Sequence, residues 1–161
     1  MSEQNKVEDV INETLTGDRQ KNALDFVSFL KTNDFSLDWD GNWWGIHYKG
    51  SCPALFGVKN DDRHDGVSIL FNYVNFACKY ISDDDLKSIS WAKIQYCHNF
   101  KTGGKECGCG DEPGKSITLF GKNIHNTCQC PLQFWDPDYK TLENIKKLML
   151  MHKNGVEKQR T

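Results

Sequence analysis

The sequence lacks any long apolar run. None of its apolar stretches approaches the roughly 18–20 residues that a helix needs to cross a membrane. Residues 1–6 are polar and contain no apolar signal segment. We therefore expect a cytoplasmic chain with no membrane partner.

The sequence also lacks an excess of positive charge. It has 20 Lys and Arg residues against 22 Asp and Glu, a net charge of −2 and a pI near 6.2. Domains that bind nucleic acids usually carry a basic patch or a basic net charge. Only the predicted C-terminal helix is rich in lysine, so we expect no strong nucleic-acid partner.

Several catalytic signatures are missing as well. The chain has no H-E-x-x-H metalloprotease motif and no H-x-E…P-C-x-x-C deaminase motif. It has no nucleophile elbow, phosphate loop or dinucleotide fingerprint, and the C-x-x-C redox motif is absent. These absences favour a non-enzymatic role.

Cysteine is the residue that the sequence does concentrate. Five of the seven cysteines, and two of the five histidines, fall between residues 97 and 130. Cytoplasmic thiols are mostly kept reduced, and an odd number of cysteines cannot pair fully within one chain. The cluster therefore indicates metal or redox chemistry. The remaining two, Cys52 and Cys78, are interpreted as packing residues.

Four of these cysteines form two short chelating pairs, Cys107 with Cys109 and Cys128 with Cys130. Zinc in a structural site takes four thiolate or imidazole ligands in a tetrahedron. A predicted strand–turn–strand lies between the pairs and could bring them face to face. The preceding segment, 97–115, has five glycines and little to pack, so a metal would order it. We predict a structural zinc site at these four cysteines.

Alternatives remain open at this stage. Cys-x-Cys is tighter than the spacing of common zinc ribbons, so Cys97, His98 and His125 are kept as alternate ligands. An iron–sulfur cluster also accepts four thiolates. The same cysteines could serve a zinc-dependent enzyme or a thiol-based redox sensor.

Apolar periodicity predicts an α+β fold. Helices are expected near 18–32, 83–96 and 137–153, the last beginning after Asp136 and ending at Gly155. Short alternating runs between them predict a mainly antiparallel sheet of four to six strands, covered by the helices.

The chain is expected to form one domain over residues 1–161. Its ends, 1–15 and 156–161, are expected to be flexible, and 97–130 is expected to be a Cys-rich metal-binding insertion before the C-terminal helix. Trp43 and Trp44 are adjacent, so in a strand they should face opposite sides of the sheet. The leading hypothesis is a small zinc-clamped domain that binds a small molecule or a protein partner.

Overall fold

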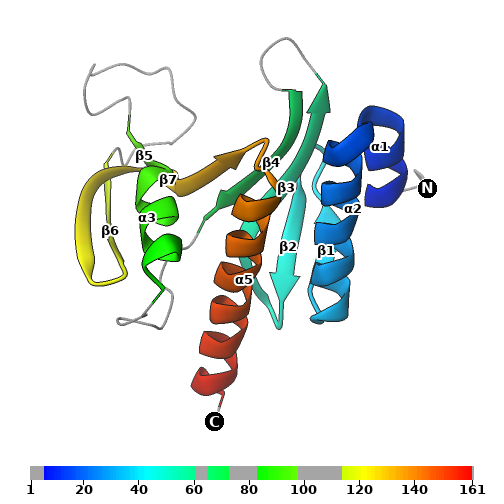
Figure 1. Ribbon diagram of the computed structural model, residues 1–161. Coiled ribbons are helices and arrows are strands. Elements are labelled where there is room, and N and C mark those ends of the chain that lie inside the picture. The colour runs from blue at the N-terminus through cyan, green and yellow to red at the C-terminus, as the bar shows by residue number, and fades with distance from the viewer. Residues whose placement is uncertain (1–5, 61–64, 73–82, 98–113, 161) are drawn as a thin grey trace.

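The computed structural model describes residues 6–60, 65–72, 83–97 and 114–160. Within these ranges the helices are α1 (Val7–Thr14), α2 (Gly17–Thr32), α3 (Asp84–Ala92) and α5 (Tyr139–Gln159). The strands are β1 (Ser36–Trp39), β2 (Trp44–Tyr48), β3 (Ser51–Asn60), β4 (Asp65–Phe71), β5 (Ile94–Tyr96), β6 (Lys115–Leu119) and β7 (Lys122–Trp135). The predicted α+β class is confirmed (Figure 1).

The described strands form one antiparallel sheet in the order β1-β2-β3-β4-β7-β5, and β6 also pairs with β7. Strands β1 to β4 are neighbours in sequence order, which is the predicted meander. The turn after β2 has positive φ at both Lys49 and Gly50, and such backbone twist suits a two-residue hairpin. The sheet has seven strands, so the prediction of four to six was too low.

The additional strand is β5, which occupies residues that periodicity assigned to a helix. Helix α3 ends at Ala92 and not at Tyr96. Ile94 is buried and pairs with Leu132 of β7. Because Ile94 also fits the apolar face of a helix, only the pairing partner decides its conformation.

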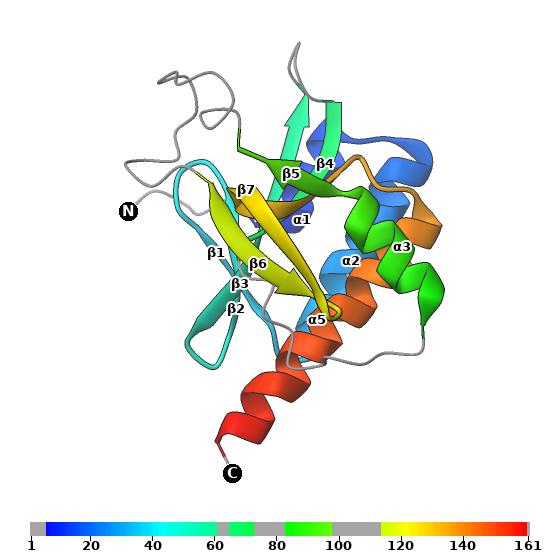
Figure 2. The ribbon, with the colours of Figure 1, turned by 90° about the vertical axis from the view of Figure 1, so that its left-hand side faces the viewer.

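Helices α1, α2 and α5 cover one face of the sheet, and α3 lies on the same side (Figures 1 and 2). The core between them is apolar and aromatic. Phe56 of β3 is fully buried and lies 5.9 Å, ring centre to ring centre, from Phe26 of α2. Ile145 and Met149 of α5 are also fully buried. The predicted separation of the paired tryptophans holds, since Trp44 is buried and Trp43 is half-exposed.

Helix α1 lies inside the segment that we expected to be flexible. Val7, Ile11 and Leu15 are all buried, at intervals of four residues that place them on one face. That face packs against α2 and β3. This helical spacing is already present in the sequence, and Val10 also packs against the core.

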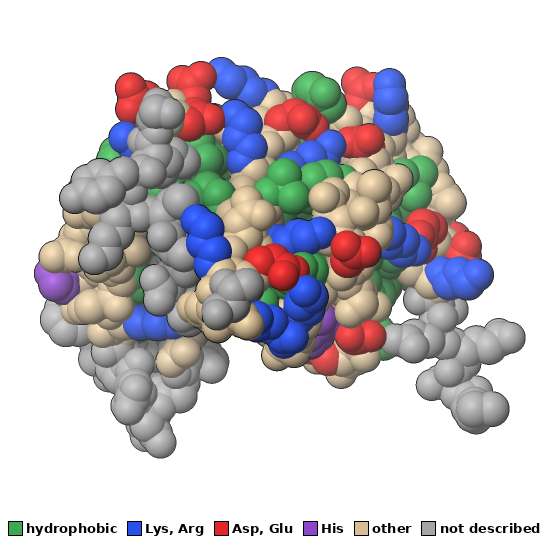
Figure 3. Space-filling model, turned by 90° about the horizontal axis from the view of Figure 1, so that it is seen from below, with side chains coloured by type: hydrophobic (Ala, Val, Ile, Leu, Met, Phe, Trp, Pro, Cys, Tyr) green, Lys and Arg blue, Asp and Glu red, His purple; other side chains and the backbone are tan. Residues whose placement is uncertain are grey.

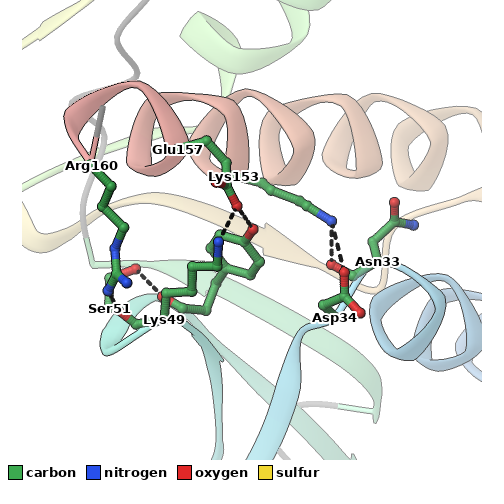
Figure 4. Close-up of polar contacts among 8 residues, drawn as sticks. Asn33, Asp34, Lys49, Ser51, Lys153, Glu157 and Arg160 are labelled. Carbon is green, nitrogen blue, oxygen red and sulfur yellow. Dashed lines mark hydrogen bonds and ion pairs between the residues drawn. The ribbon is translucent and has the colours of Figure 1, made fainter.

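Helix α5 extends beyond Gly155, where we expected it to end. Residues after this buried glycine form hydrogen bonds with the β2–β3 hairpin (Figure 4). Glu157 accepts from Lys49 Nζ at 2.6 Å, and Arg160 donates to the Lys49 carbonyl at 2.7 Å. These tertiary contacts oppose the cost of a glycine within a helix, which is about 1 kcal/mol.

The start of α5 also differs from the prediction. Its N-cap is Asp138, whose side chain accepts from the Thr141 amide at 2.8 Å, and not Asp136. This helix has 21 residues, yet no helix in the described ranges combines the length and apolar character that crossing a membrane requires.

Candidate metal centre

Strand β7 is the longest strand of the sheet and carries the Cys128–Cys130 pair. Its Leu132 pairs with β4 on one side and β5 on the other, and its Thr127 pairs with β6 and β5. Strands β4 and β6 therefore share one edge of β7. Between them lie residues 128–131, here called the cysteine segment, which has no strand partner on that edge among the described residues.

The cysteine segment also bulges away from β5 on its other edge. Tyr96 pairs with Thr127 and Ile94 with Leu132, so one residue of β5 faces four residues of β7. Pro131 lies in this bulge, where its missing N–H does not interrupt a hydrogen-bonded ladder. Residues Cys128 and Cys130 therefore lie outside the regular strand pairing that the described residues form.

Three points of the chain meet around the cysteine segment. The amide of Cys97, at the end of β5, donates to the Asn126 carbonyl at 2.7 Å. Lys115, at the start of β6, pairs with Thr127. Asn72, directly after β4, contacts Cys130 through its side chain. Residues on either side of segment 98–113, and the residue that precedes segment 73–82, are therefore held beside the cysteines.

Amide side chains contact both cysteines. The Cys130 Sγ lies 3.1 Å from Asn72 Oδ1, to which the thiol donates. Gln133 Nε2 donates to the Cys130 carbonyl at 2.9 Å and approaches Cys128 Sγ at 3.8 Å. Both cysteines are half-buried. Gln133 alternates with the core residues Leu132 and Phe134, so these contacts lie on the face away from α2 and α5.

The structure describes only part of the predicted ligand set. Cys128 and Cys130 are brought together on β7, whereas Cys107, Cys109 and the alternate ligand His98 lie outside the described residues. Cys78, interpreted as a packing residue, lies outside them too. The complete four-cysteine site therefore stays a prediction.

The remaining alternate ligands do not complete a site with the described pair. Cys97 is buried, and His125 is exposed with its Nδ1 3.0 Å from Ser116 Oγ. Among the described residues no three His, Cys, Asp or Glu side chains form a group that could hold a metal ion. Any site at Cys128 and Cys130 would need ligands from the rest of the chain.

Cys52 has different surroundings. A Cβ placed on Gly45 would lie 3.3 Å from Cys52 Sγ and 2.6 Å from His47 Nε2, so both side chains crowd this glycine. Burial raises the pKa of the Cys52 thiol, and the carboxylates of Asp38 and Asp40 raise it further. Cys52 is thereby kept protonated, which disfavours metal ligation or thiolate chemistry.

The charged surface shows no single-sign patch on the face seen in Figure 3, where acidic and basic side chains are interspersed. Lysines of α5 are paired with acids: Lys146 with Asp25 at 2.5 Å and Lys147 with Asp83 at 2.7 Å. The lysine-rich helix therefore presents lysines paired with acids, and not an unpaired basic stripe, at Lys146 and Lys147.

A depression of about 510 Å³ lies where the N-terminal ends of α2 and α5 meet. Its lining combines apolar side chains, among them Val67 and Leu142, with charged ones, and Arg19 forms an ion pair with Asp136 at 2.8 Å across it. None of the lining residues was among the predicted site residues.

Sequence reasoning missed Asn72 and Gln133. Neither belongs to a motif, and an amide side chain has no spacing that marks it as a neighbour of cysteine. Alternation gave no signal either, because Gln133 lies an odd number of residues from both Cys128 and Cys130 and would face the other side of a regular strand. The chain matches no model of a known protein family, no curated protein and no solved structure.

Proposed function

We propose that this chain is a non-enzymatic binding domain with a structural zinc site. In this proposal Cys128 and Cys130 supply two ligands from β7. Cys107 and Cys109 supply the other two from the segment that leaves after β5 and returns at β6. Zinc would cross-link that segment to the sheet, which is the role of a closed four-ligand site.

The observation that carries the proposal is the anchoring of both ends of segment 98–113 next to Cys128. Tyr96 and Lys115 pair with the same residue, Thr127, from opposite edges of β7. Six positions separate Cys109 from Lys115, and six extended residues reach up to about 20 Å. The second cysteine pair is therefore tethered within reach of the first.

Exposed aromatic side chains border the same region and support a protein partner there. Tyr96, which is 55% exposed, pairs with the residue before Cys128. Trp135 is 39% exposed, and its indole donates to the Gln133 that contacts Cys128. Tyrosine and tryptophan are enriched at protein interfaces and dominate their binding energy. We therefore place the partner surface beside the cysteine segment.

The metal proposal is tested by elemental analysis of protein purified without chelator or affinity metal, with thiols titrated before and after metal removal. We expect about one zinc ion per chain and about four thiols masked until it is removed. Cys128→Ser and Cys130→Ser should lose the metal, whereas Cys52→Ser should keep it.

Other results would point to the competing functions. Metal with about three masked thiols would leave an open coordination position and favour a zinc-dependent enzyme. Absence of metal, with all seven thiols titratable, would overturn the zinc proposal. Reversible loss of two thiols under mild oxidant would then favour a redox sensor.

The partner surface is tested by affinity capture with matched variants. A partner that binds this surface should be captured by the wild-type chain and lost with the double variant Tyr96→Ser, Trp135→Ser. Tyr139→Ser is the control, because Tyr139 is equally aromatic, is 61% exposed and begins α5 away from the cysteine segment. Equal loss in both variants would count against a surface beside the cysteines.

A further inference from the structure

The orientation of the Gln133 amide is determined by its neighbour Trp135. An indole N–H can only donate a hydrogen bond. Trp135 Nε1 lies 3.2 Å from Gln133 Oε1, so the amide oxygen must face the indole. The amide nitrogen is then directed the other way, toward the cysteine segment.

The Gln133 amide nitrogen has two hydrogens, and the two cysteines lie in its direction. It donates to the Cys130 carbonyl at 2.9 Å and approaches Cys128 Sγ at 3.8 Å. A single side chain thus holds the backbone of one cysteine and points a donor at the sulfur of the other. A donor at this position favours sulfur that carries negative charge, as in a metal-bound thiolate.

We propose that Gln133, oriented by Trp135, is the positioning residue of a metal site at Cys128 and Cys130. This inference rests on the proposed zinc site and adds the groups that prepare its two described ligands. Gln133 closes the bulge so that the two cysteines stay together, and it stabilises the Cys128 thiolate by an N–H···S contact. Partners of metal ligands commonly act in this way, and their loss costs on the order of 10- to 100-fold in metal affinity.

Asn72 adds a second consequence. The Cys130 thiol now donates to Asn72 Oδ1 at 3.1 Å. A thiolate on a metal has no proton to donate, so the oxygen would face negatively charged sulfur. On metal binding the Asn72 amide should rotate and present its nitrogen to Cys130. The environment of this amide therefore reports occupancy of the site.

The test compares Gln133→Leu with Gln129→Leu in the full chain. Both replace a glutamine of β7 by an apolar residue of similar size, and Gln129 lies exposed between the two cysteines. Zinc affinity is measured by chelator competition. Binding of Co²⁺ alone is followed through its sulfur-to-metal charge-transfer band. A lost N–H···S contact raises the energy of the sulfur electrons, so this band moves to longer wavelength.

We expect Gln133→Leu to bind zinc about 10- to 100-fold more weakly than wild type and to shift the band. Gln129→Leu should do neither. Trp135→Phe keeps an aromatic side chain but removes the indole N–H, so it should give a smaller shift in the same direction. This second variant also tests the idea if Gln133→Leu does not fold.

Two results would overturn the inference, and they differ from each other. A wild-type chain that binds one metal ion, with Gln133→Leu and Trp135→Phe unchanged in affinity and band position, would refute the role of Gln133 alone. A wild-type chain that binds neither zinc nor Co²⁺ would refute the proposed metal site together with it.

Discussion

The meander of β1 to β4 forms the first end of the sheet and strands β5, β6 and β7 form the second end, and the two ends differ in how they are held together. Strands β3 and β4 pair in continuous register from Ala54 with Phe71 to Asn60 with Asp65, and helices cover their inner face. Strands β5 and β6 both pair with β7 through register shifts, and β7 carries the cysteine segment. The first end is stabilised by apolar burial, which needs no ligand. The second also buries Leu119 and Leu132 in the core, but it leaves half-buried cysteines in an irregular strand, where the proposed metal ion would add stabilisation.

The largest expected loss of stability comes from truncating a core side chain at the first end of the sheet. Phe56→Ala removes a fully buried ring that contacts Phe26 and Trp44. The free energy of unfolding should fall by about 3–5 kcal/mol, because a cavity remains. Denaturant unfolding measures this. The loss should be the same with and without chelator, and Tyr96→Ala, exposed beside the cysteines, should cost less than about 0.5 kcal/mol.

The next effect should appear only at the second end and only with metal present. Cys128→Ser should lose the stabilisation that bound zinc provides, about 4 kcal/mol when free zinc exceeds its dissociation constant 1,000-fold. Cys52→Ser should lose much less. Thermal unfolding of both variants, with zinc and with chelator, provides the comparison. Equal melting temperatures for the two variants in the presence of zinc would contradict a structural role for the cysteine pair.

A smaller effect tests the packing on the face opposite the helices. A Cβ on Gly57 would lie 2.7 Å from Cε3 of the Trp43 ring and 2.8 Å from Ser68 Oγ. Gly57→Ala should therefore cost about 1–3 kcal/mol, since the ring must move. Trp43→Ala should relieve that clash, so the double variant should cost less than the two single costs added together. Strict additivity in denaturant unfolding would show that the two residues do not share this contact.

The smallest effect should be the pH dependence of the first end. Burial lowers the pKa of His152 below 6.5, and its Nε2 lies 2.8 Å from Ser51 Oγ. The unfolded chain then binds this proton more readily than the folded chain. Stability from this group is therefore fully present above pH 6.5 and is lost as the pH falls through the lowered folded-state pKa.

Urea unfolding between pH 7.5 and pH 5 should show this loss in the wild-type chain. His152→Gln keeps a donor for Ser51 but cannot titrate, so it should lack this component. An identical pH profile in the two chains would show that His152 contributes nothing to it.

Much of the fold follows from local patterns. The meander over β1 to β4 and helix α2 agree with apolar periodicity and turn residues. Helix α1 also shows such periodicity, in Val7, Ile11 and Leu15, although we expected that segment to be flexible. Strand β5 does not, because the role of Ile94 depends on its distant partner Leu132. The predicted end of α5 was wrong for a related reason. Gly155 is a common helix stop signal, but Glu157 and Arg160 beyond it bond to Lys49, which is distant in the sequence.

For the candidate site, too, some features follow from the sequence and others only from the tertiary structure. The sequence by itself supplied two Cys-x-Cys pairs, Cys107 with Cys109 and Cys128 with Cys130, and it predicted them as metal ligands because ligand chemistry depends on residue type and spacing. Only the tertiary structure decided that both ends of the intervening segment meet at Thr127 and that Gln133 points a donor at the sulfur. Strand pairing and side-chain orientation arise from contacts between residues far apart in the chain, which spacing along the chain does not encode.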